Sequence, residues 1–219
     1  MSDGRRIGLL GGTFDPIHNG HLDAADAAQQ RLALDDVLFV PSNVPPHRQA
    51  GPTASGYDRY ALIALAIQDR PRYRASAMEL ERTGHSYTVD TLRRMQARGV
   101  RPSQMFFIIG TDAFAEIATW HRYPDVLDAA NFAVIARPGT SLDRAVARTP
   151  ALVSRIRNVD ARSESTGIFL VEARTRDVSS TAIRAQLAAG QPIDDLVPAA
   201  VARYIAAHDL YGTVNHLHG

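Results

Sequence analysis

The chain has 219 residues and a formal net charge of +1, which gives no bulk electrostatic case for binding nucleic acid or an anionic membrane. This length fits one α/β domain, so we expect a single domain over 1–219, with its core at about 5–206 and a C-terminal tail at 207–219. Cysteine is absent, which excludes disulfides, thiolate metal sites and a cysteine nucleophile. All 24 Lys-or-Arg positions are Arg, which excludes a phosphate-loop lysine.

The first residues have the features of neither a signal peptide nor a membrane span. Residues 1–6 lead into a short apolar run at 7–10, and no long apolar stretch follows. We therefore expect a cytoplasmic protein with no membrane partner.

The beginning of the chain has the pattern of a strand, a turn and a helix. The run at 7–10 predicts a strand, and the alanine-rich stretch after His21 favours a helix. Between them, residues 11–21 read GGTFDPIHNGH. Gly11 and Gly12 would let the backbone turn without a Cβ clash and approach a phosphate closely, while Pro16 stiffens the loop.

His18 and His21 are candidates for binding that phosphate. They stand three residues apart, so both project from one face if they lie in the first helical turn. An imidazole there can donate a hydrogen bond to a phosphate oxygen, assisted by the partial positive charge of the helix end. The alternative is a Gly/Pro turn that contains two histidines by chance.

A proline-rich loop follows the next predicted strand, at 36–40. Three prolines within 41–48 are incompatible with a helix or a central strand, so this segment is expected to be an ordered loop. Ligands of open α/β sheets bind at the carboxyl ends of strands, so Asn43, His47 and Arg48 are candidates to face a substrate. A surface loop with incidental polar residues is the alternative.

The middle of the chain predicts a helix over 57–68, a strand within 73–77, a helix that starts with a capping hydroxyl in 86–91 and runs to 99, and a strand over 105–109. Asp112 follows that last strand. Its carboxylate is placed either to bind a ribose hydroxyl or to cap a helix N-terminus.

The single Trp of the chain, Trp120, lies among polar residues beside a proline rather than in an apolar run. Such a ring either packs in a core or stacks on a planar heterocycle. A strand over 131–136 then ends at Arg137. We expect a helix and a variable loop within 140–165, and a last strand at 168–171.

A second candidate anion site begins the helix that follows residue 177. Ser180, Thr181 and Arg184 combine two hydroxyls and a guanidinium with the N–H groups of a helix start. A terminal helix is predicted from the Asp-Asp-Leu-Val-Pro stretch at 194–198 to about 208. Alternating strands and helices favour an α/β fold with a doubly wound, mostly parallel sheet.

Together these motifs resemble those of the bacterial nicotinate mononucleotide adenylyltransferase family. Five stretches carry the resemblance, in the family's order over roughly 7–204: GGTFDPIHNGHL, PSNVPPHR, SYTVDTL, FIIGTDAFAEIATWHRYPD with IARPG after it, and VSSTAIR. The first motif is shared by a wider superfamily of nucleotidyltransferases, and the proline loop and the Trp loop narrow the match. Arg48 departs from the pattern, because many relatives have Lys there.

The resemblance implies a Rossmann-like nucleotidyltransferase fold and the transfer of AMP from ATP to nicotinate mononucleotide, which yields deamido-NAD and pyrophosphate. His18, His21 and Arg184 would act in catalysis. ATP would be bound by Gly11, Gly12, Thr13, Phe14, His18, His21, Arg137, Ser180, Thr181 and Arg184. The mononucleotide would be bound by Asn43, His47, Arg48, Tyr87, Thr88, Asp112 and Trp120, with Trp120 against the pyridine ring. Mg²⁺ would be held mainly by the ATP phosphates and water, without a protein ligand.

The expected chemistry needs no general base, because the attacking phosphate oxygen is already anionic. Catalysis would consist of positioning and charge neutralisation around the α-phosphate and pyrophosphate. Another enzyme with the same first motif, such as phosphopantetheine adenylyltransferase or a cytidylyltransferase, is an alternative. A catalytically silent nucleotide-binding regulator is another. No nucleic-acid partner is expected, and a homo-oligomer is left open.

Overall fold

A computed structural model describes residues 4–45, 51–137, 139, 141–160 and 163–212. These residues form a sheet of seven strands in the order β3-β2-β1-β4-β5-β7-β6, and each neighbouring pair runs parallel. The strands are β1 Ile7–Gly12, β2 Asp36–Pro41, β3 Tyr73–Ala75, β4 Met105–Gly110, β5 Asn131–Ala136, β6 Ile156–Arg157 and β7 Ile168–Glu172.

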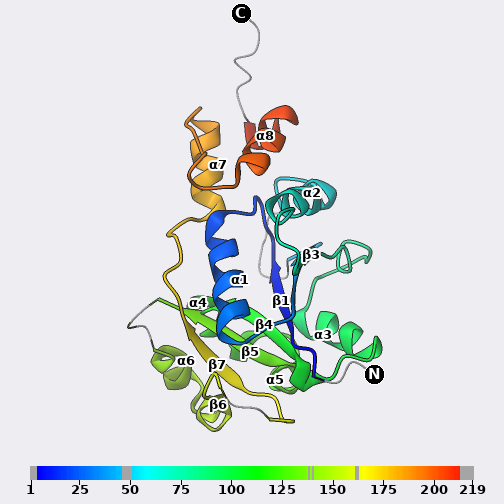
Figure 1. Cartoon of the computed structure of the whole chain (residues 1–219), viewed down its shortest axis with the longest axis vertical. Helices are drawn as coiled ribbons and strands as arrows, with labels where there is room; N and C mark the ends of the chain where they lie inside the picture. The colour runs from blue at the N-terminus through cyan, green and yellow to red at the C-terminus, as the bar shows by residue number, and fades with distance from the viewer. Residues whose placement is uncertain (1–3, 46–50, 138, 140, 161–162, 213–219) are drawn as a thin grey trace, which may run out of the picture.

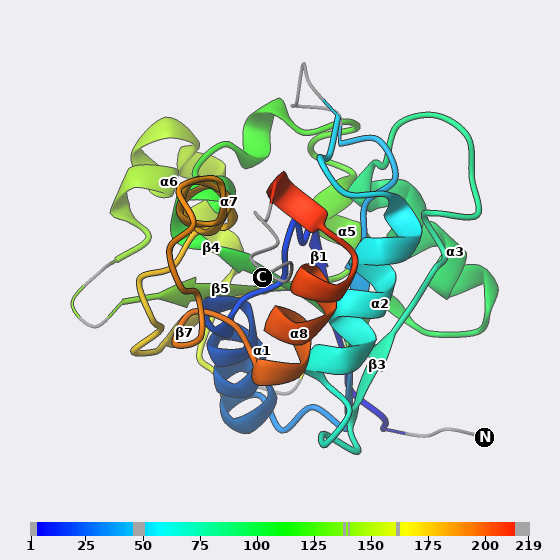
Figure 2. The ribbon, with the colours of Figure 1, turned by 90° about the horizontal axis from the view of Figure 1, so that it is seen from above.

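Helices cover both faces of this sheet. The α-helices are α1 Asn19–Arg31, α2 Gly56–Ala66, α3 Thr88–Ala97, α4 Thr111–Phe114, α5 Val126–Ala129, α6 Asp143–Arg148, α7 Ser180–Ala188 and α8 Ala199–Ala207. Short 3₁₀ turns lie at Pro102–Gln104, Ile117–Thr119, Pro150–Arg155 and Leu210–Gly212. Figure 1 shows α2, α7 and α8 together at one end of the molecule, and Figure 2 shows α1 and α6 on opposite sides of β4 and β5.

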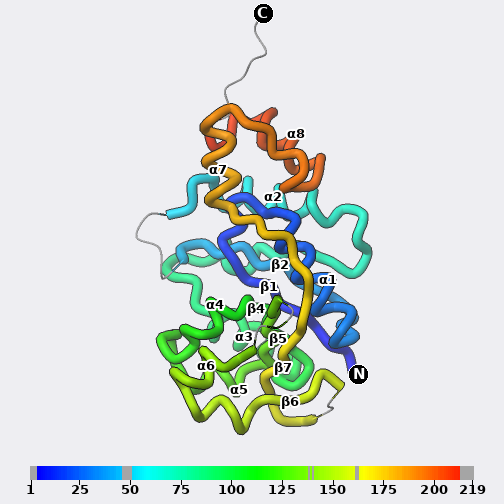
Figure 3. The backbone as a smooth tube through the Cα atoms, turned by 90° about the vertical axis from the view of Figure 1, so that its left-hand side faces the viewer, coloured from blue at the N-terminus to red at the C-terminus, as the bar shows by residue number. Residues whose placement is uncertain are grey.

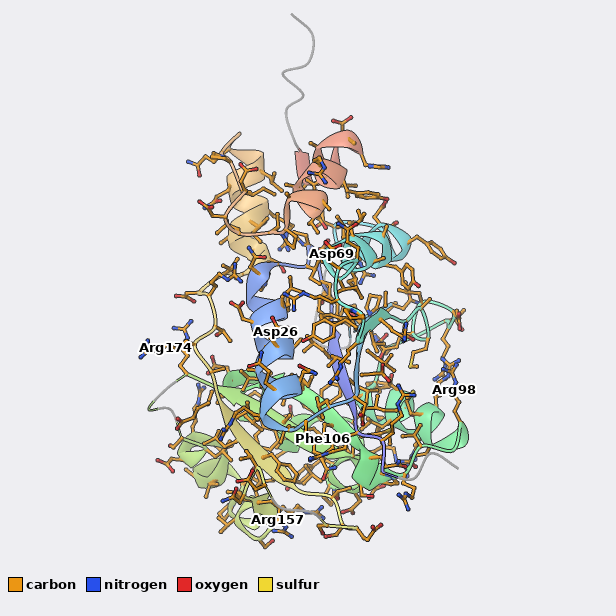
Figure 4. All side chains as sticks on the ribbon, in the orientation of Figure 1. Asp26, Asp69, Arg98, Phe106, Arg157 and Arg174 are labelled. Atoms are coloured by element: carbon orange, nitrogen blue, oxygen red, sulfur yellow. The ribbon has the colours of Figure 1, made fainter. Side chains whose placement is uncertain are left out.

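Alternation along the strands sorts the apolar side chains into two cores. In β4, Phe106 and Ile108 pack with residues of α1, α2, α7 and α8, whereas Phe107 and Ile109 pack with residues of α3, α4 and α5. Successive strand residues point to opposite faces, so a continuous apolar run is the pattern of a strand buried on both sides. Phe106 accordingly lies inside the molecule in Figure 4, while the labelled Arg98 and Arg157 lie at its margins.

The strand order reverses between β1 and β4. The chain moves outward from β1 to β2 and β3, and then returns to β4 on the other side of β1. The helices that follow β1 and β4 thus lie on opposite faces, which leaves a crevice at the carboxyl ends of these two strands. Crevices of this kind are the usual ligand sites of open α/β sheets.

The predicted fold class is confirmed, and the local differences have simple causes. The strand β3 ends at Ala75, and the two-residue β6 inside the expected variable region was not predicted. Helix α3 follows Tyr87 without a side-chain cap, so the predicted hydroxyl cap is wrong there. Ser179 does cap α7, accepting from the Ala182 N–H. Among the described residues, no helix is long and apolar enough to cross a membrane.

Candidate active site

A cleft of about 1090 Å³ opens at the carboxyl edge of the sheet, over β1 and β4. Its walls come from the end of β1, the start of α1, the segment 79–88, the Trp120 loop and the connection 173–179 between β7 and α7. Figure 3 shows that connection running along one side of the molecule from β7 up to α7. The volume is at the upper end of the range for small-molecule sites, so the cleft has room for more than one small ligand.

The loop after β1 turns at Phe14 and not at the glycines. Gly11 and Gly12 lie at the end of β1, and the left-handed backbone belongs to Phe14, with φ of 51°. The prediction that these two glycines provide the turn is therefore wrong. They are needed for space instead, because a Cβ on Gly11 would lie 3.2 Å from the Phe107 ring and one on Gly12 would lie 3.3 Å from the Phe14 ring.

His18 and His21 lie face to face at the start of α1. Their ring centroids are 3.7 Å apart with an angle of 25° between the planes. The prediction assumed that both lie in the first helical turn, whereas His18 is the N-cap residue with an extended backbone, and the two rings stack from these positions. The backbone N–H of His18 donates to His21 Nδ1 at 3.2 Å. Since a neutral imidazole carries one proton, this bond leaves the His21 proton on Nε2, where it can be donated to a ligand.

Burial keeps both imidazoles neutral near pH 7. It lowers the pKa of His18 to about 4, partly opposed by the carboxylate of Asp23. The pKa of His21 is also lowered well below its ordinary value, first by burial and then by the neighbouring His18. Both rings are therefore neutral imidazoles rather than cations. His18 Nδ1 is buried without a hydrogen-bond partner among the described residues.

Gly20, between the two histidines, allows the 173–179 connection to approach α1. A Cβ on Gly20 would lie 3.1 Å from the carbonyl oxygen of Arg176 and 3.2 Å from His18 Nδ1. Arg176 is fixed there by Asp23, which accepts from its Nη2 at 2.7 Å and from its backbone N–H at 2.9 Å. The same guanidinium lowers the pKa of Asp23. Sequence reasoning missed Arg176, although it directly precedes the predicted second anion site.

Aromatic side chains form another part of the cleft wall. Trp120 packs edge-on against the Phe107 ring, with centroids 5.9 Å apart, and remains half-buried on the cleft wall. The next residue, His121, stacks on Tyr87 at 4.1 Å and also lines the cleft. This contact joins the Trp120 loop to the start of α3, where Thr88 is a lining residue. His121 was not predicted, although its place beside Trp120 is the signal that could have found it.

The proline loop contributes less than expected to the described part of the cleft. Ser42 and Pro45 line it, whereas the Asn43 side chain donates to the Arg82 carbonyl and its backbone N–H donates to Ser86 Oγ at 2.9 Å. His47 and Arg48 lie outside the residues that the structure describes.

Glu79 is a further lining residue that the sequence reasoning missed. Burial raises the pKa of its carboxyl, opposed by hydrogen bonds from the side chains of Thr91 and Ser86. Its only sequence signal is its position shortly before the predicted Tyr87–Thr88 segment.

Asp112 and Arg137 both line the cleft, and both are exposed and already paired. Asp112 accepts from Arg144 Nη1 at 3.2 Å, and Arg137 donates to Asp177 at 2.6 Å. Gly110 is the N-cap residue of α4, so Asp112 is not a helix cap and is left available to a ligand. Exposed pairs of this kind are weak, and a ligand can replace them at little cost.

The predicted second anion site is attached to the loop after β1. Ser180 Oγ donates to the Pro16 carbonyl at 2.8 Å, and Arg184 Nη1 donates to the Asp15 carbonyl at 2.6 Å. Arg184 Nη2 also donates to Thr181 Oγ1 at 3.3 Å. Ser180 and Arg184 thus adjoin the loop at 13–18 after β1 from the α7 side, but neither they nor Thr181 form the wall of the cleft itself.

The cleft wall therefore contains neutral imidazoles beside a helix N-terminus as well as aromatic rings. No group of three or more His, Asp or Glu side chains among the described residues is placed to hold a metal ion. The site suits a phosphorylated ligand that also carries a planar ring.

Comparisons with known proteins identify the family to which this chain belongs. The Cytidylyltransferase-like family matches residues 9–186. A probable nicotinate-nucleotide adenylyltransferase of Herpetosiphon aurantiacus is 39% identical over 207 residues, which are 94% of this chain and 98% of the relative. One from a Thermoanaerobacter species is 37% identical over 206 residues, which are 94% of each chain. The chain belongs to the nicotinate-nucleotide adenylyltransferase family.

Solved structures support the same fold. The nicotinic acid mononucleotide adenylyltransferase of Plasmodium falciparum, solved in complexes with APC and with NaAD, has a TM-score of 0.72 to this chain. The alignment covers 96% of this chain and 98% of that one at 16% identity. At this identity the likeness extends to the fold.

Proposed function

We infer that this protein transfers AMP from ATP to nicotinate mononucleotide, giving deamido-NAD and pyrophosphate in NAD synthesis. The observation that carries the inference is the stacked pair His18–His21 at the start of α1, which lines the same cleft as Trp120. Relatives described as nicotinate-nucleotide adenylyltransferases align over nearly the whole chain. The reaction needs a triphosphate site and a pyridine nucleotide site within reach of each other.

In the proposed reaction an anionic phosphate oxygen of the mononucleotide attacks the α-phosphorus of ATP in line. The new P–O bond forms as the bond from the α-phosphorus to the bridging oxygen breaks, and pyrophosphate leaves with that oxygen. No proton has to be removed from the nucleophile. Its rate then depends on alignment of the two nucleotides and on stabilisation of the charge that develops on the phosphates.

His18 and His21 would donate hydrogen bonds to the phosphates at the α1 terminus, where the helix dipole also favours negative charge. The hydrogen bond from the His18 N–H to His21 Nδ1 supports this role, because it directs the His21 proton to Nε2. Tyr87, Thr88 and Trp120 would hold the nicotinate mononucleotide, and Asp112 would bind ribose. Arg137 and Arg184 would neutralise phosphate charge.

Mg²⁺ would enter as the ATP complex. Since the described residues hold no cluster of potential metal ligands, the ion would be bound by phosphate oxygens and water. When bound, it would supply positive charge to the triphosphate. That the protein has no nucleic-acid partner stays a prediction, and a homo-oligomer stays an open alternative.

A panel of acceptors tests the proposed function. The enzyme would be incubated with ATP, Mg²⁺ and either nicotinate mononucleotide, nicotinamide mononucleotide or phosphopantetheine, and the products identified by mass. Deamido-NAD and pyrophosphate in equal amounts are the expected products. Turnover of phosphopantetheine alone would assign the cleft to another enzyme of the superfamily, and no pyrophosphate from any acceptor would favour a regulator.

A further inference from the structure

Arg59 on α2 is a charged residue in an apolar position. Its helix buries one face through Arg59, Leu62, Ile63 and Ala66, and the Arg59 side chain is only 1% exposed. Burying a guanidinium is costly unless hydrogen bonds and opposite charge compensate for the lost hydration. The partners of Arg59 therefore indicate what this residue is needed for.

The partners of Arg59 belong to the loop at 13–18, which follows β1, and to the segment before α2. Arg59 Nη1 donates to the Thr13 carbonyl at 2.7 Å, and Nε donates to the Ala54 carbonyl at 3.3 Å. Asp15, also 1% exposed, accepts from the N–H groups of Thr53 and Ala54 at 2.7 and 3.0 Å. Ala54 thus donates to the loop through its N–H and accepts from Arg59 through its carbonyl.

The loop needs such support because Phe14 adopts a left-handed backbone, which is unfavourable for a residue with a side chain. The carbonyls of its two neighbours are both held by guanidinium groups. Arg59 binds the carbonyl of Thr13, and Arg184 binds that of Asp15. Helices α2 and α7 therefore fix the loop from two sides.

Phe14 passes this geometry on to the histidine pair. Its ring meets the His21 ring edge-on, with centroids 4.9 Å apart, and its side chain is 1% exposed. A shift of the Thr13–Phe14 peptide would move the Phe14 ring, and with it the surface on which His21 rests. Small displacements of groups that bind a reacting phosphate have large effects on rate.

We propose that Arg59 is a positioning residue for the ATP triphosphate, acting through the Thr13 carbonyl and the Phe14 ring on His21. Arg59 lines no part of the cleft, so it acts without touching substrate. The proposal rests on the proposed function, because it takes the His18–His21 end of the cleft as the triphosphate site.

The test compares Arg59→Lys with Arg70→Lys in the purified full-length enzyme. Lys keeps the positive charge but replaces the planar fork by a single ammonium, which cannot hold the two carbonyls in the same geometry. Arg70 is a matched control, because it pairs with Asp26 on α1 and lies over the Tyr73 ring. Asp26, labelled on α1 in Figure 4, is not a residue of the cleft.

Arg59→Lys is expected to raise the KM for ATP or lower kcat by about tenfold or more, while the KM for nicotinate mononucleotide changes by less than about twofold. Arg70→Lys should leave kcat and the KM values for ATP and nicotinate mononucleotide within about twofold of wild type. Equal increases in both KM values would indicate a general structural role and overturn the proposal. So would an Arg59→Lys enzyme that matches wild type.

A second variant keeps the proposal testable if the Arg59→Lys enzyme does not fold. Arg59→Gln removes the buried charge of Arg59 but keeps an amide N–H that can donate to the Thr13 carbonyl, and it leaves Asp15, which pairs with Arg184 Nη1 at 3.8 Å, unchanged. Calorimetry of a methylene analogue of ATP should show binding about tenfold weaker than to wild type, and unchanged affinity would overturn the proposal. This measurement needs no turnover, so it still tests Arg59 if the wild-type enzyme makes no deamido-NAD and the proposed function fails.

Discussion

His18 and His21 stack at a centroid distance of 3.7 Å, and the backbone N–H of one donates to Nδ1 of the other. Two parallel imidazoles at this distance would repel each other strongly if both were protonated. Burial and proximity together keep them neutral, with their pKa values lowered. Under the proposed function, the pair would donate hydrogen bonds to phosphate at neutral pH without any change of protonation.

Replacing His18 by Ala should abolish most activity and leave the fold intact. Loss of one preorganised hydrogen-bond donor typically lowers kcat on the order of 10²–10³-fold. His208→Ala is the matched control, because His208 stacks on Tyr204 at the end of α8, away from the cleft. Steady-state kinetics and circular dichroism would be measured for both variants. A folded His18→Ala enzyme within about threefold of the wild-type kcat would remove His18 from the catalytic role.

The lowered pKa of His18 also makes stability dependent on pH. Its folded-state value of about 4 lies below the ordinary 6.5, so the unfolded chain takes up this proton first as the pH falls. The titration of His18 therefore leaves the free energy of unfolding unchanged above about pH 6.5. Between that pH and about pH 4 it falls by up to about 1.4 kcal/mol per pH unit because of this residue. The pKa of His21 is lowered too, so its protonation in the unfolded chain also lowers the free energy of unfolding as the pH falls.

Urea unfolding at pH 7 and pH 5 would test this dependence in the wild type and in His18→Gln. The variant has no imidazole at this position to titrate, so its free energy of unfolding should fall less on acidification. An identical fall in the two proteins would show that His18 is not the group responsible.

Arg184→Ala should raise the KM for ATP and leave the KM for nicotinate mononucleotide nearly unchanged. Arg184 donates to the Asp15 carbonyl in the loop at 13–18, whereas Trp120 is a lining residue of the cleft. Separate titrations of the two substrates at saturating partner would give both constants. A selective rise in the mononucleotide KM would assign Arg184 to the other pocket.

Much of this architecture follows from sequence pattern. Apolar runs such as 105–109 identify strands buried on both faces. The spacing of His18 and His21 indicates that the two rings are neighbours, although His18 is the extended N-cap residue of α1 and not part of its first turn. The loop conformation could not be predicted in this way. A left-handed backbone at Phe14 has no residue signal, because glycine is the usual residue there and two glycines stand close by.

Long-range contacts account for the remaining differences. In the sequence, Arg59 is simply a polar residue within a predicted helix. Its hydrogen bond to the Thr13 carbonyl forms only in the folded chain. The contacts of Ser180 and Arg184 with the loop join residues more than 160 positions apart. Helical or strand periodicity contains no information about such pairs.

Trp120→Ala should weaken both nicotinate and nicotinamide mononucleotides while leaving their ratio nearly unchanged. The indole ring would stack on either pyridine, so its loss removes an interaction that the two substrates share, worth about 1 kcal/mol beyond the buried area. The measurement is kcat/KM for each mononucleotide in the wild type and the variant. A large change in the ratio would give Trp120 a part in distinguishing carboxylate from amide.

The most direct test of the account is kcat/KM for nicotinate and nicotinamide mononucleotides at saturating ATP and Mg²⁺. The two substrates differ only in a carboxylate and an amide, and a site that leaves a buried polar group unpaired can reject the wrong one strongly. We predict a clear preference for the nicotinate substrate, with deamido-NAD as the product. Equal values, or a preference for the amide, would contradict the assignment to deamido-NAD synthesis while leaving adenylyl transfer in place.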